Sequence, residues 1–224
     1  MIAGRVFHII MKILILDTET TGLPTERNAP FWETEKWPYI VQLSYILYDL
    51  DANAVTVEHD FIVKMKEEIK ISPESIKIHG ITNEISRKRG HDIKDVLDIF
   101  HICLEQATYV VAHNLSFDKT LMMAEYKRNN LPNNFSSEKI YYCTMKKSKE
   151  LCNFSAVNYT TKEKYIRYPK LLELHNKLFG VVPNNLHNSF VDILVCFRCF
   201  YKMVFDVDIL KINRHIRSLF KKYC

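Results

Sequence analysis

Three short motifs hold the residues whose types and spacing could do chemistry. The first, Asp17-Thr18-Glu19, ends a continuous apolar run and sets two carboxylates two residues apart. Side chains at positions i and i+2 of a strand lie on the same face, so the two acids would repel each other. Burying such a pair is costly without compensation, and a divalent cation is its natural partner. The alternative for this motif alone is a strand end with solvated acids.

The other two motifs each place an acid at the beginning of a predicted helix. Residues 113–118 (HNLSFD) pass from a strand into a helix, where the macrodipole favours an ionised Asp118 in the first turn. Residues 187–192 (HNSFVD) set His187 in the loop before a helix and Asp192 in its first turn, among apolar neighbours. Asp118 alone could be an ordinary N-terminal acid, and a His-x4-Asp spacing alone is common. Together with the first motif, in this order and each at the end of an element, they indicate one site.

Several predicted elements must position these motifs. Residues 12–17 form an apolar run typical of a strand covered on both faces. Alternating residues over 39–49 and 55–63 predict two half-buried strands, joined as a hairpin around Asp51 and Asn53. Shorter strands are predicted at 108–112 and 140–143, with helices over 92–106, from a Ser116 cap to about 129–132, over 169–180, and from 188 or 189 to about 205. This order favours a mixed sheet flanked by helices over two separate domains.

Two stretches lack a regular pattern, and we interpret both as irregular surface insertions. They are residues 24–37, rich in charge and aromatics, and residues 153–168.

The composition limits the class of protein. The chain has 224 residues, 47% hydrophobic and 25% charged, as in one globular domain. No apolar stretch is long enough for a membrane span. Residues 1–11 lack the pattern of a secretory signal, and we interpret them as an N-terminal extension. The six cysteines are then expected to stay reduced in an intracellular protein of the cytoplasm or nucleus. Cys196 and Cys199 are expected to be buried thiols rather than a zinc or redox site.

The positive charge gathers near the C-terminus. The net charge of +5 is 31 Lys and Arg minus 26 Asp and Glu. Residues 211–224 hold five Lys and Arg and no acid, so the remaining 26 basic and 26 acidic residues cancel. We interpret 207–224 as a basic helical tail. It could contact phosphates or an acidic partner, or be a solvated helix end whose cations suit the macrodipole.

The motifs resemble those of the DEDDh group of metal-dependent 3′→5′ exonucleases, which includes epsilon-like proofreading exonucleases. The first motif resembles that group's Asp-x-Glu, the second its Asn-x-x-Phe-Asp and the third its His-x4-Asp, in a resemblance spanning about residues 12–205. A sister group carries Tyr four residues before the last Asp. Asn188 stands at that position here, so the histidine group fits.

This resemblance implies a fold and a site. The fold class is α/β, with a ribonuclease H-like mixed five-stranded sheet, three antiparallel strands followed by parallel ones, in an exonuclease domain over residues 12–206. The acids implied to hold two Mg²⁺ or Mn²⁺ ions are Asp17, Glu19, Asp118 and Asp192. His187 is implied to be the general base. The implied contacts to the terminal nucleotide are Thr20, Leu23, His79, Asn114 and Phe117.

Some of these assignments have alternatives. His79 lies in a His-Gly-Ile-Thr turn, where a purely structural role is the alternative, and Phe117 could equally belong to the core. Cys143 stands where many members of the group carry Asp, and the stretch after residue 23 is longer than usual. These departures bear on substrate specificity.

The implied activity is hydrolysis of DNA from its 3′ end to 5′-mononucleotides, in proofreading or repair. The expected partner is nucleic acid with a single-stranded 3′ end, whereas a polymerase or a second copy of the chain as partner stays open. One alternative is a 3′→5′ exoribonuclease, because recognition of a 2′-hydroxyl depends on details of the pocket. The other is a non-catalytic module that binds nucleic acid or a polymerase. Four acids and a histidine argue against that module, which has little reason to hold repelling charges together.

Overall fold

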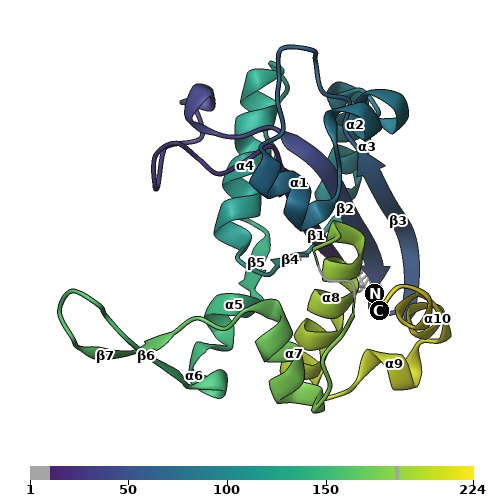
Figure 1. The fold of residues 1–224 in the computed structure, drawn as a ribbon. Coiled ribbons are helices and arrows are strands. Elements are labelled where there is room, and N and C mark those ends of the chain that lie inside the picture. The colour runs from purple at the N-terminus through teal and green to yellow at the C-terminus, as the bar shows by residue number, and fades with distance from the viewer. Residues whose placement is uncertain (1–10, 185–186) are drawn as a thin grey trace, which may run out of the picture.

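A mixed five-stranded sheet forms the centre of the computed structural model, which describes residues 11–184 and 187–224 (Figure 1). Its strand order is β3-β2-β1-β4-β5. The strands are β1 (Lys12–Thr20), β2 (Ile40–Asp49), β3 (Ala54–Ile62), β4 (Tyr109–Ala112) and β5 (Ile140–Cys143). β1, β2 and β3 pair antiparallel, whereas β4 pairs parallel with both β1 and β5. The expected α/β fold, with a ribonuclease H-like mixed sheet, is confirmed.

Helices cover both faces of the sheet. The helices are α1 (Pro73–His79), α2 (Asn83–Arg89), α3 (Ile93–Gln106), α4 (Leu115–Arg128), α5 (Thr144–Lys147), α6 (Lys149–Cys152), α7 (Leu171–Phe179), α8 (Ser189–Phe205), α9 (Ile209–Ile212) and α10 (Arg214–Tyr223). Leu14 and Leu16 of β1 pack in one core with α3 and α4. Ile13 and Ile15 pack in the other core with α7 and α8. The continuous apolar run of β1 is therefore buried on both faces, as predicted.

The hairpin of β2 and β3 forms as expected, but the prediction that β2 is half-buried was wrong. All residues of β2 up to Tyr48 are buried, because α8 covers the face that carries Gln42 and Ser44. Both side chains donate hydrogen bonds to Asp60 Oδ1 on β3, at 2.7 and 2.8 Å. Their polarity therefore reflects a buried hydrogen-bond network rather than a solvent-facing side.

Local capping explains where the long helices begin and end. Asp92 caps α3, Asn188 caps α8 by accepting from the amides of Phe190 and Val191, and Gly180 ends α7 in a left-handed conformation at φ 69°. The prediction that Ser116 caps α4 was wrong. The N-cap residue is Asn114, at φ 74°, and α4 begins at Leu115. Asn tolerates this left-handed conformation better than most residues.

The two stretches predicted to be irregular differ from each other. Residues 24–37 contain only a 3-10 turn, η1 (Thr34–Lys36). Residues 153–168 instead form an antiparallel hairpin of β6 (Phe154–Val157) and β7 (Lys164–Arg167), which projects from the body of the protein (Figure 1). The prediction of an irregular segment was wrong here, because strands of four residues are too short to show an alternating pattern.

The C-terminal residues pack onto the domain. Ile209 and Ile216 are buried against α8 in the second core, and the Arg217 guanidinium donates to the carbonyls of Leu210 and Lys211. The predicted extension falls almost wholly on residues 1–10, outside the described residues, and the domain boundaries stay predictions. Cys196 and Cys199 are buried free thiols in α8, as expected. Among the described helices, none has the length and apolar character required to cross a membrane.

Candidate active site

The end of β1 presents Asp17 and Glu19 on one side of the strand. Their side chains are partly exposed, whereas Thr18 between them is buried and donates a 2.8 Å hydrogen bond to Asp118 Oδ1. The pairing register with β2 shifts between Glu19 and Thr20, so the regular ladder ends at the motif. Because side chains alternate along β1, Asp17 and Glu19 lie on one face of the strand. The Thr18 hydroxyl, which bonds Asp118, lies on the other.

The third motif brings Asp192 to the same place from α8. One carboxylate oxygen from each of Asp17, Glu19 and Asp192 lies within 4.8 Å of the others. Asp192 is in the first turn of α8, and its Oδ2 accepts from the His187 amide at 3.2 Å. Contact between α8 and β1 therefore brings the first and third motifs together in space.

Asp118 completes the group from α4. It lies in the first turn of the helix, as predicted, and only 3% of its surface is exposed. The coulombic effect of Asp118 on the pKa of Asp17 is larger than that of Asp192 or Glu19. Asp118 therefore adds to the negative potential at Asp17, although it is not one of the three acids whose oxygens lie within 4.8 Å of one another.

Burial shifts the pKa of all four carboxyl groups upward, and repulsion between the acids adds to the shift for Asp17, Glu19 and Asp118. Burial raises the pKa of Glu19 to about 8, with Asp192 and Asp118 adding to the shift. Burial also raises the pKa of Asp118 and of Asp192 to about 7, and holds that of Asp17 well above its ordinary range. An acid that resists ionisation in this way gains most from a nearby cation.

His187 borders the same hollow. Its side chain is exposed, its backbone is left-handed at φ 73°, and it lines a cavity of about 530 Å³ with Asp17 and Asp192. A non-glycine residue in this conformation needs support from its surroundings. The hydrogen bond from the His187 amide to Asp192 gives that support and links the histidine loop to the acid.

The predicted nucleotide contacts lie around two adjoining hollows. Thr20, Leu23, His79 and Phe117 line a cavity of about 460 Å³ together with Glu19. Asn114 instead lines a cleft of about 710 Å³, which it shares with Leu23 and Phe117 and which we call the outer cleft. The side chain of Leu23 is 83% exposed at the border of the two hollows. Phe117 also contacts the Trp37 ring in the core, at 6.0 Å between centroids, so it belongs to both.

His79 has a structural role in addition to facing the cavity. Its Nδ1 accepts from the Ile81 amide at 3.0 Å, so the neutral ring carries its proton on Nε2, 3.2 Å from the Thr20 carbonyl. Burial lowers its pKa, which keeps this neutral form. Because both nitrogens bond backbone groups, only the ring surface remains for a nucleotide. Its predicted substrate contact stays a prediction.

Sequence reasoning missed three residues at the site. Thr18 was passed over as a spacer in the first motif, although it bonds Asp118. His113 lines the cavity of Asp17, bonded through its two nitrogens to Thr144 Oγ1 and the Pro169 carbonyl, and burial lowers its pKa to about 4. Tyr168 lines both this cavity and the outer cleft. The first two stand within the three motifs, and Tyr168 directly precedes the helix predicted over 169–180, a position that could have drawn attention to it.

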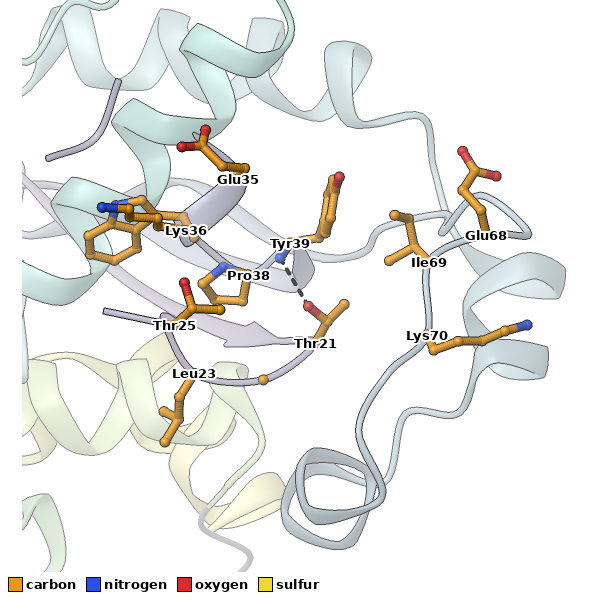
Figure 2. Close-up of a pocket in the computed structure, with 12 residues that line it drawn as sticks. Thr21, Leu23, Thr25, Glu35, Lys36, Pro38, Tyr39, Glu68, Ile69 and Lys70 are labelled. Carbon is orange, nitrogen blue, oxygen red and sulfur yellow. Dashed lines mark hydrogen bonds between the residues drawn. The ribbon is translucent and has the colours of Figure 1, made fainter. Parts of the chain in front are cut away.

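A further pocket, of about 290 Å³, is lined by residues at the two ends of the stretch 24–37 and by residues 68–70 (Figure 2). Its lining includes Thr21, whose hydroxyl accepts from the Tyr39 amide at 3.0 Å, along with Glu35 and Glu68. Neither the four clustered acids nor His187 line it. In Figure 2 Leu23 extends away from Glu35 and Glu68. We therefore separate this pocket from the carboxylate site.

The donor set fits divalent cations of the hard type. All close ligand atoms are carboxylate oxygens, which suit Mg²⁺ and Mn²⁺ better than the sulfur and imidazole ligands typical of structural zinc. Within the described residues, none of the four acids forms an ion pair with Lys or Arg. The raised pKa values show that the protein itself leaves this negative charge uncompensated.

Comparison with known proteins identifies the family. The model of the exonuclease family RNase_T matches residues 14–200, a range that contains all three motifs. The chain therefore belongs to this exonuclease family. The resemblance of the three motifs to those of DEDD-type 3′→5′ exonucleases is thereby confirmed. No curated protein sequence matches the chain.

Solved structures with the same fold include exonuclease I of E. coli. Its complex with a dT13 oligonucleotide superposes with a TM-score of 0.66 at 17% identity, covering 93% of this chain and 45% of that one. Its complex with a 5cy-dT13 oligonucleotide gives a TM-score of 0.64 at 15% identity, covering 87% and 41%. A product-bound exonuclease I gives 0.63 at 15% identity, covering 95% and 46%. The chain thus spans less than half the length of these proteins, and the likeness shows the fold.

Proposed function

We propose that this chain is a metal-dependent 3′→5′ exonuclease that hydrolyses DNA from its 3′ end and releases 5′-mononucleotides. One observation carries the proposal: two carboxylates from the end of β1 and a third from the distant helix α8 meet within 4.8 Å, beside a cavity that His187 also lines, in a chain of the exonuclease family. The proposal places the work in proofreading or repair, in the cytoplasm or nucleus.

The proposal assigns two Mg²⁺ or Mn²⁺ ions to the acids. Asp17, Glu19 and Asp192 would hold one ion, and Asp17 with Asp118 would hold or orient the other. Bound ions of this kind polarise the scissile phosphate, stabilise the leaving oxygen and lower the pKa of the attacking water. The hydrogen bond from Thr18 keeps the Asp118 carboxylate oriented toward the group. The His187 amide does the same for Asp192.

His187 is proposed as the general base. A neutral imidazole takes a proton efficiently near neutral pH because its ordinary pKa is about 6.5. Its exposed ring borders the cavity that Asp17 and Asp192 also line, so a water bound in this cavity would have both the acids and the ring beside it. The imidazole would take a proton from this water as the water oxygen bonds to phosphorus and the P–O3′ bond breaks. The protonated ring would then lose its proton to solvent, while the departing 3′ oxygen gains one to become a hydroxyl.

DNA is the proposed substrate because the solved relatives named above hold oligodeoxynucleotides. In the proposal, Leu23 and the Phe117 ring contact the terminal base, and Thr20, Asn114 and His79 surround its sugar and phosphate. These residues line two hollows that meet at Leu23.

A length-ladder assay tests the proposal. Purified protein with Mn²⁺ is incubated with 5′-labelled single-stranded DNA, with duplex DNA carrying a mismatched 3′ end, and with RNA. We expect one-nucleotide shortening of the DNA from its 3′ end and release of 5′-mononucleotides, and no shortening by His187→Ala. Shortening of RNA in preference to DNA would change the substrate, and wild-type turnover by the variant would remove the histidine from its role.

Melting experiments separate the enzyme from a non-catalytic module. Mg²⁺ or Mn²⁺ is expected to raise the melting temperature, because a ligand that binds only the folded state stabilises it. The same salt of K⁺, at equal ionic strength, is the control.

A further inference from the structure

The outer cleft lies between the segment that follows β1 and the segment that begins with α5. One wall comes from residues 23–29, with Arg27 exposed, and the other from Met145, Lys146 and Tyr168. Figure 1 shows residues 24–37 and the β6–β7 hairpin extending on the same side of the molecule. The cleft shares Met145 and Tyr168 with the cavity of Asp17, and Leu23 and Phe117 with the cavity of Glu19. It therefore opens onto the carboxylate site from two directions.

The wall formed by residues 24–37 is held in place. The guanidinium of Arg128 donates to the carbonyls of Thr34 and Trp37, at 2.7 and 2.9 Å, and pairs with the buried Glu125. The Trp37 indole donates to the Ala29 carbonyl at 3.2 Å. These bonds tie the stretch to α4, so this wall exists before any ligand arrives.

The segment that supplies the opposite wall is rich in positive charge. Residues 144–170, which we call the basic arm, contain seven Lys and Arg and two Glu, a net charge of +5. The net charge of the whole chain is also +5, and the C-terminal residues 211–224 contribute another +5, so all other residues together carry −5. Among the described residues, Lys146, Lys147, Lys162 and Lys164 form no ion pair. Their charge is available to an anionic ligand.

Exposed aromatic rings lie among these cations. Tyr159 is 91% exposed at the turn of the hairpin, and Tyr165 and Tyr168 are each about half exposed. The ammonium of Lys149 lies 5.5 Å from the centre of the Tyr168 ring. Alternating cations and aromatic surfaces are the combination that binds single-stranded nucleic acid, because rings stack on unpaired bases while cations contact phosphates.

We propose that the basic arm and residues 23–29 hold the single-stranded part of the substrate upstream of its reacting 3′ end, in the outer cleft. This inference rests on the proposed exonuclease function and adds the residues that hold the strand away from its reacting end. The phosphates contact Lys146, which lines the cleft, and the next residue, Lys147, whose side chain is exposed, while an unpaired base stacks on Tyr168. A base-paired duplex cannot offer its bases to these rings.

The C-terminal basic residues provide a matched control. α10 lies on the opposite side of the molecule from the β6–β7 hairpin (Figure 1). Lys221 and Lys222 are exposed there, and α10 packs on α8 rather than on the outer cleft. Lys221→Gln/Lys222→Gln therefore removes the same charge as Lys146→Gln/Lys147→Gln at a different place.

Binding is measured by fluorescence anisotropy with labelled oligothymidylate at several salt concentrations, in an Asp17→Asn background that leaves the strand intact. The Lys146→Gln/Lys147→Gln pair is expected to weaken binding about tenfold and to lower the slope of log Kd against log salt by about 1.4, from two phosphate contacts. The Lys221→Gln/Lys222→Gln pair is expected to change Kd by less than about twofold. Tyr168→Ala is expected to weaken binding about fivefold with the slope unchanged, because stacking carries no charge.

Equal weakening by the two lysine pairs, or none by the pair in the basic arm, would overturn the inference. Duplex DNA bound as tightly as the single strand would also overturn it. Failure of the exonuclease proposal is recognised separately, because wild-type protein would then leave the oligothymidylate intact with Mn²⁺ while the binding comparison still gives its answer.

Discussion

Two groups of acidic side chains in this protein differ in what balances their charge: the four acids at the end of β1, and Asp208 and Glu173 elsewhere in the fold. At the end of β1 burial raises the pKa of each of the four acids, and repulsion raises that of Asp17, Glu19 and Asp118 further. Beyond the end of α8, burial would raise the pKa of Asp208, but the Arg198 guanidinium, 2.7 Å away, outweighs it and holds the pKa below its ordinary value. Hydrogen bonds from Arg167 lower the pKa of Glu173 to about 2.

The difference separates function from stability. Asp208 and Glu173 have their counterion within the fold, so their charge holds elements together. The acids at β1 have no cationic side chain bonded to them among the described residues. Their charge therefore lowers the stability of the folded state until a bound cation compensates it. The predictions below test this contrast.

The largest effect is expected from Asp17→Asn. Removing this charge should lower exonuclease turnover by about three orders of magnitude or more, because groups around a bound ion act as a unit. The metal-free variant should nevertheless melt higher than the wild type, because one repelling charge is gone. Turnover by the ladder assay and melting in EDTA check the two parts. A variant that loses both activity and stability would contradict the contrast.

Asp208→Asn should lower the stability of the protein and leave its turnover unchanged. Arg198 and Asp208 are only 12% and 14% exposed, so loss of the anion leaves a nearly buried cation and lowers the free energy of unfolding by about 3 kcal/mol. The amide retains an oxygen for the cap bond to the Leu210 amide, which isolates the effect of the charge. Urea unfolding gives the stability. Exonuclease turnover below the melting range should equal that of the wild type.

The pH dependence of stability should come from the site at β1. The folded-state pKa values, about 7 for Asp118 and Asp192 and about 8 for Glu19, lie above the ordinary values near 4. The folded protein therefore holds these protons more tightly, and the stability they give is complete at low pH and lost as the pH rises to about 8. Between about pH 5 and pH 8 the metal-free protein should become progressively less stable, by several kcal/mol.

Two controls accompany this measurement. Added Mg²⁺ should flatten the profile by favouring the ionised acids. Glu173 contributes nothing to this window, because its lowered pKa places its titration below about pH 4.5, where its stabilisation is lost as the pH falls toward 2. If the free energy of unfolding of the metal-free protein instead rose between pH 5 and pH 8, the acids at β1 would not be uncompensated charges.

The smallest effect is expected from Thr18→Val. The variant keeps the shape of the buried side chain but removes the 2.8 Å hydrogen bond to Asp118. Loss of such an orienting partner weakens metal binding about tenfold. Isothermal titration with Mn²⁺ measures it. Thr56→Val, on the exposed side of β3, is the control and should leave the affinity unchanged.

Much of this organisation could be predicted from the sequence because it is encoded locally. The apolar run of β1, the helical spacing of α3 and α8, and three motifs at element ends suffice to place Asp17, Glu19 and Asp192 at one sheet edge. Burial of Gln42 and Ser44 could not be predicted, because it depends on α8 packing across β2. The β6–β7 hairpin and the helices of four to seven residues are too short for a periodic signal.

Residues 25–36 begin and end at almost the same point, since the Thr25 amide donates to the Lys36 carbonyl at 2.9 Å. A loop closed at its base can change in length at a cost that grows only slowly with the number of residues. Evolution or an engineer could therefore graft a different loop onto this base without disturbing the catalytic sheet. The geometry separates the part of the enzyme that must stay constant from a part that can be exchanged to suit new substrates.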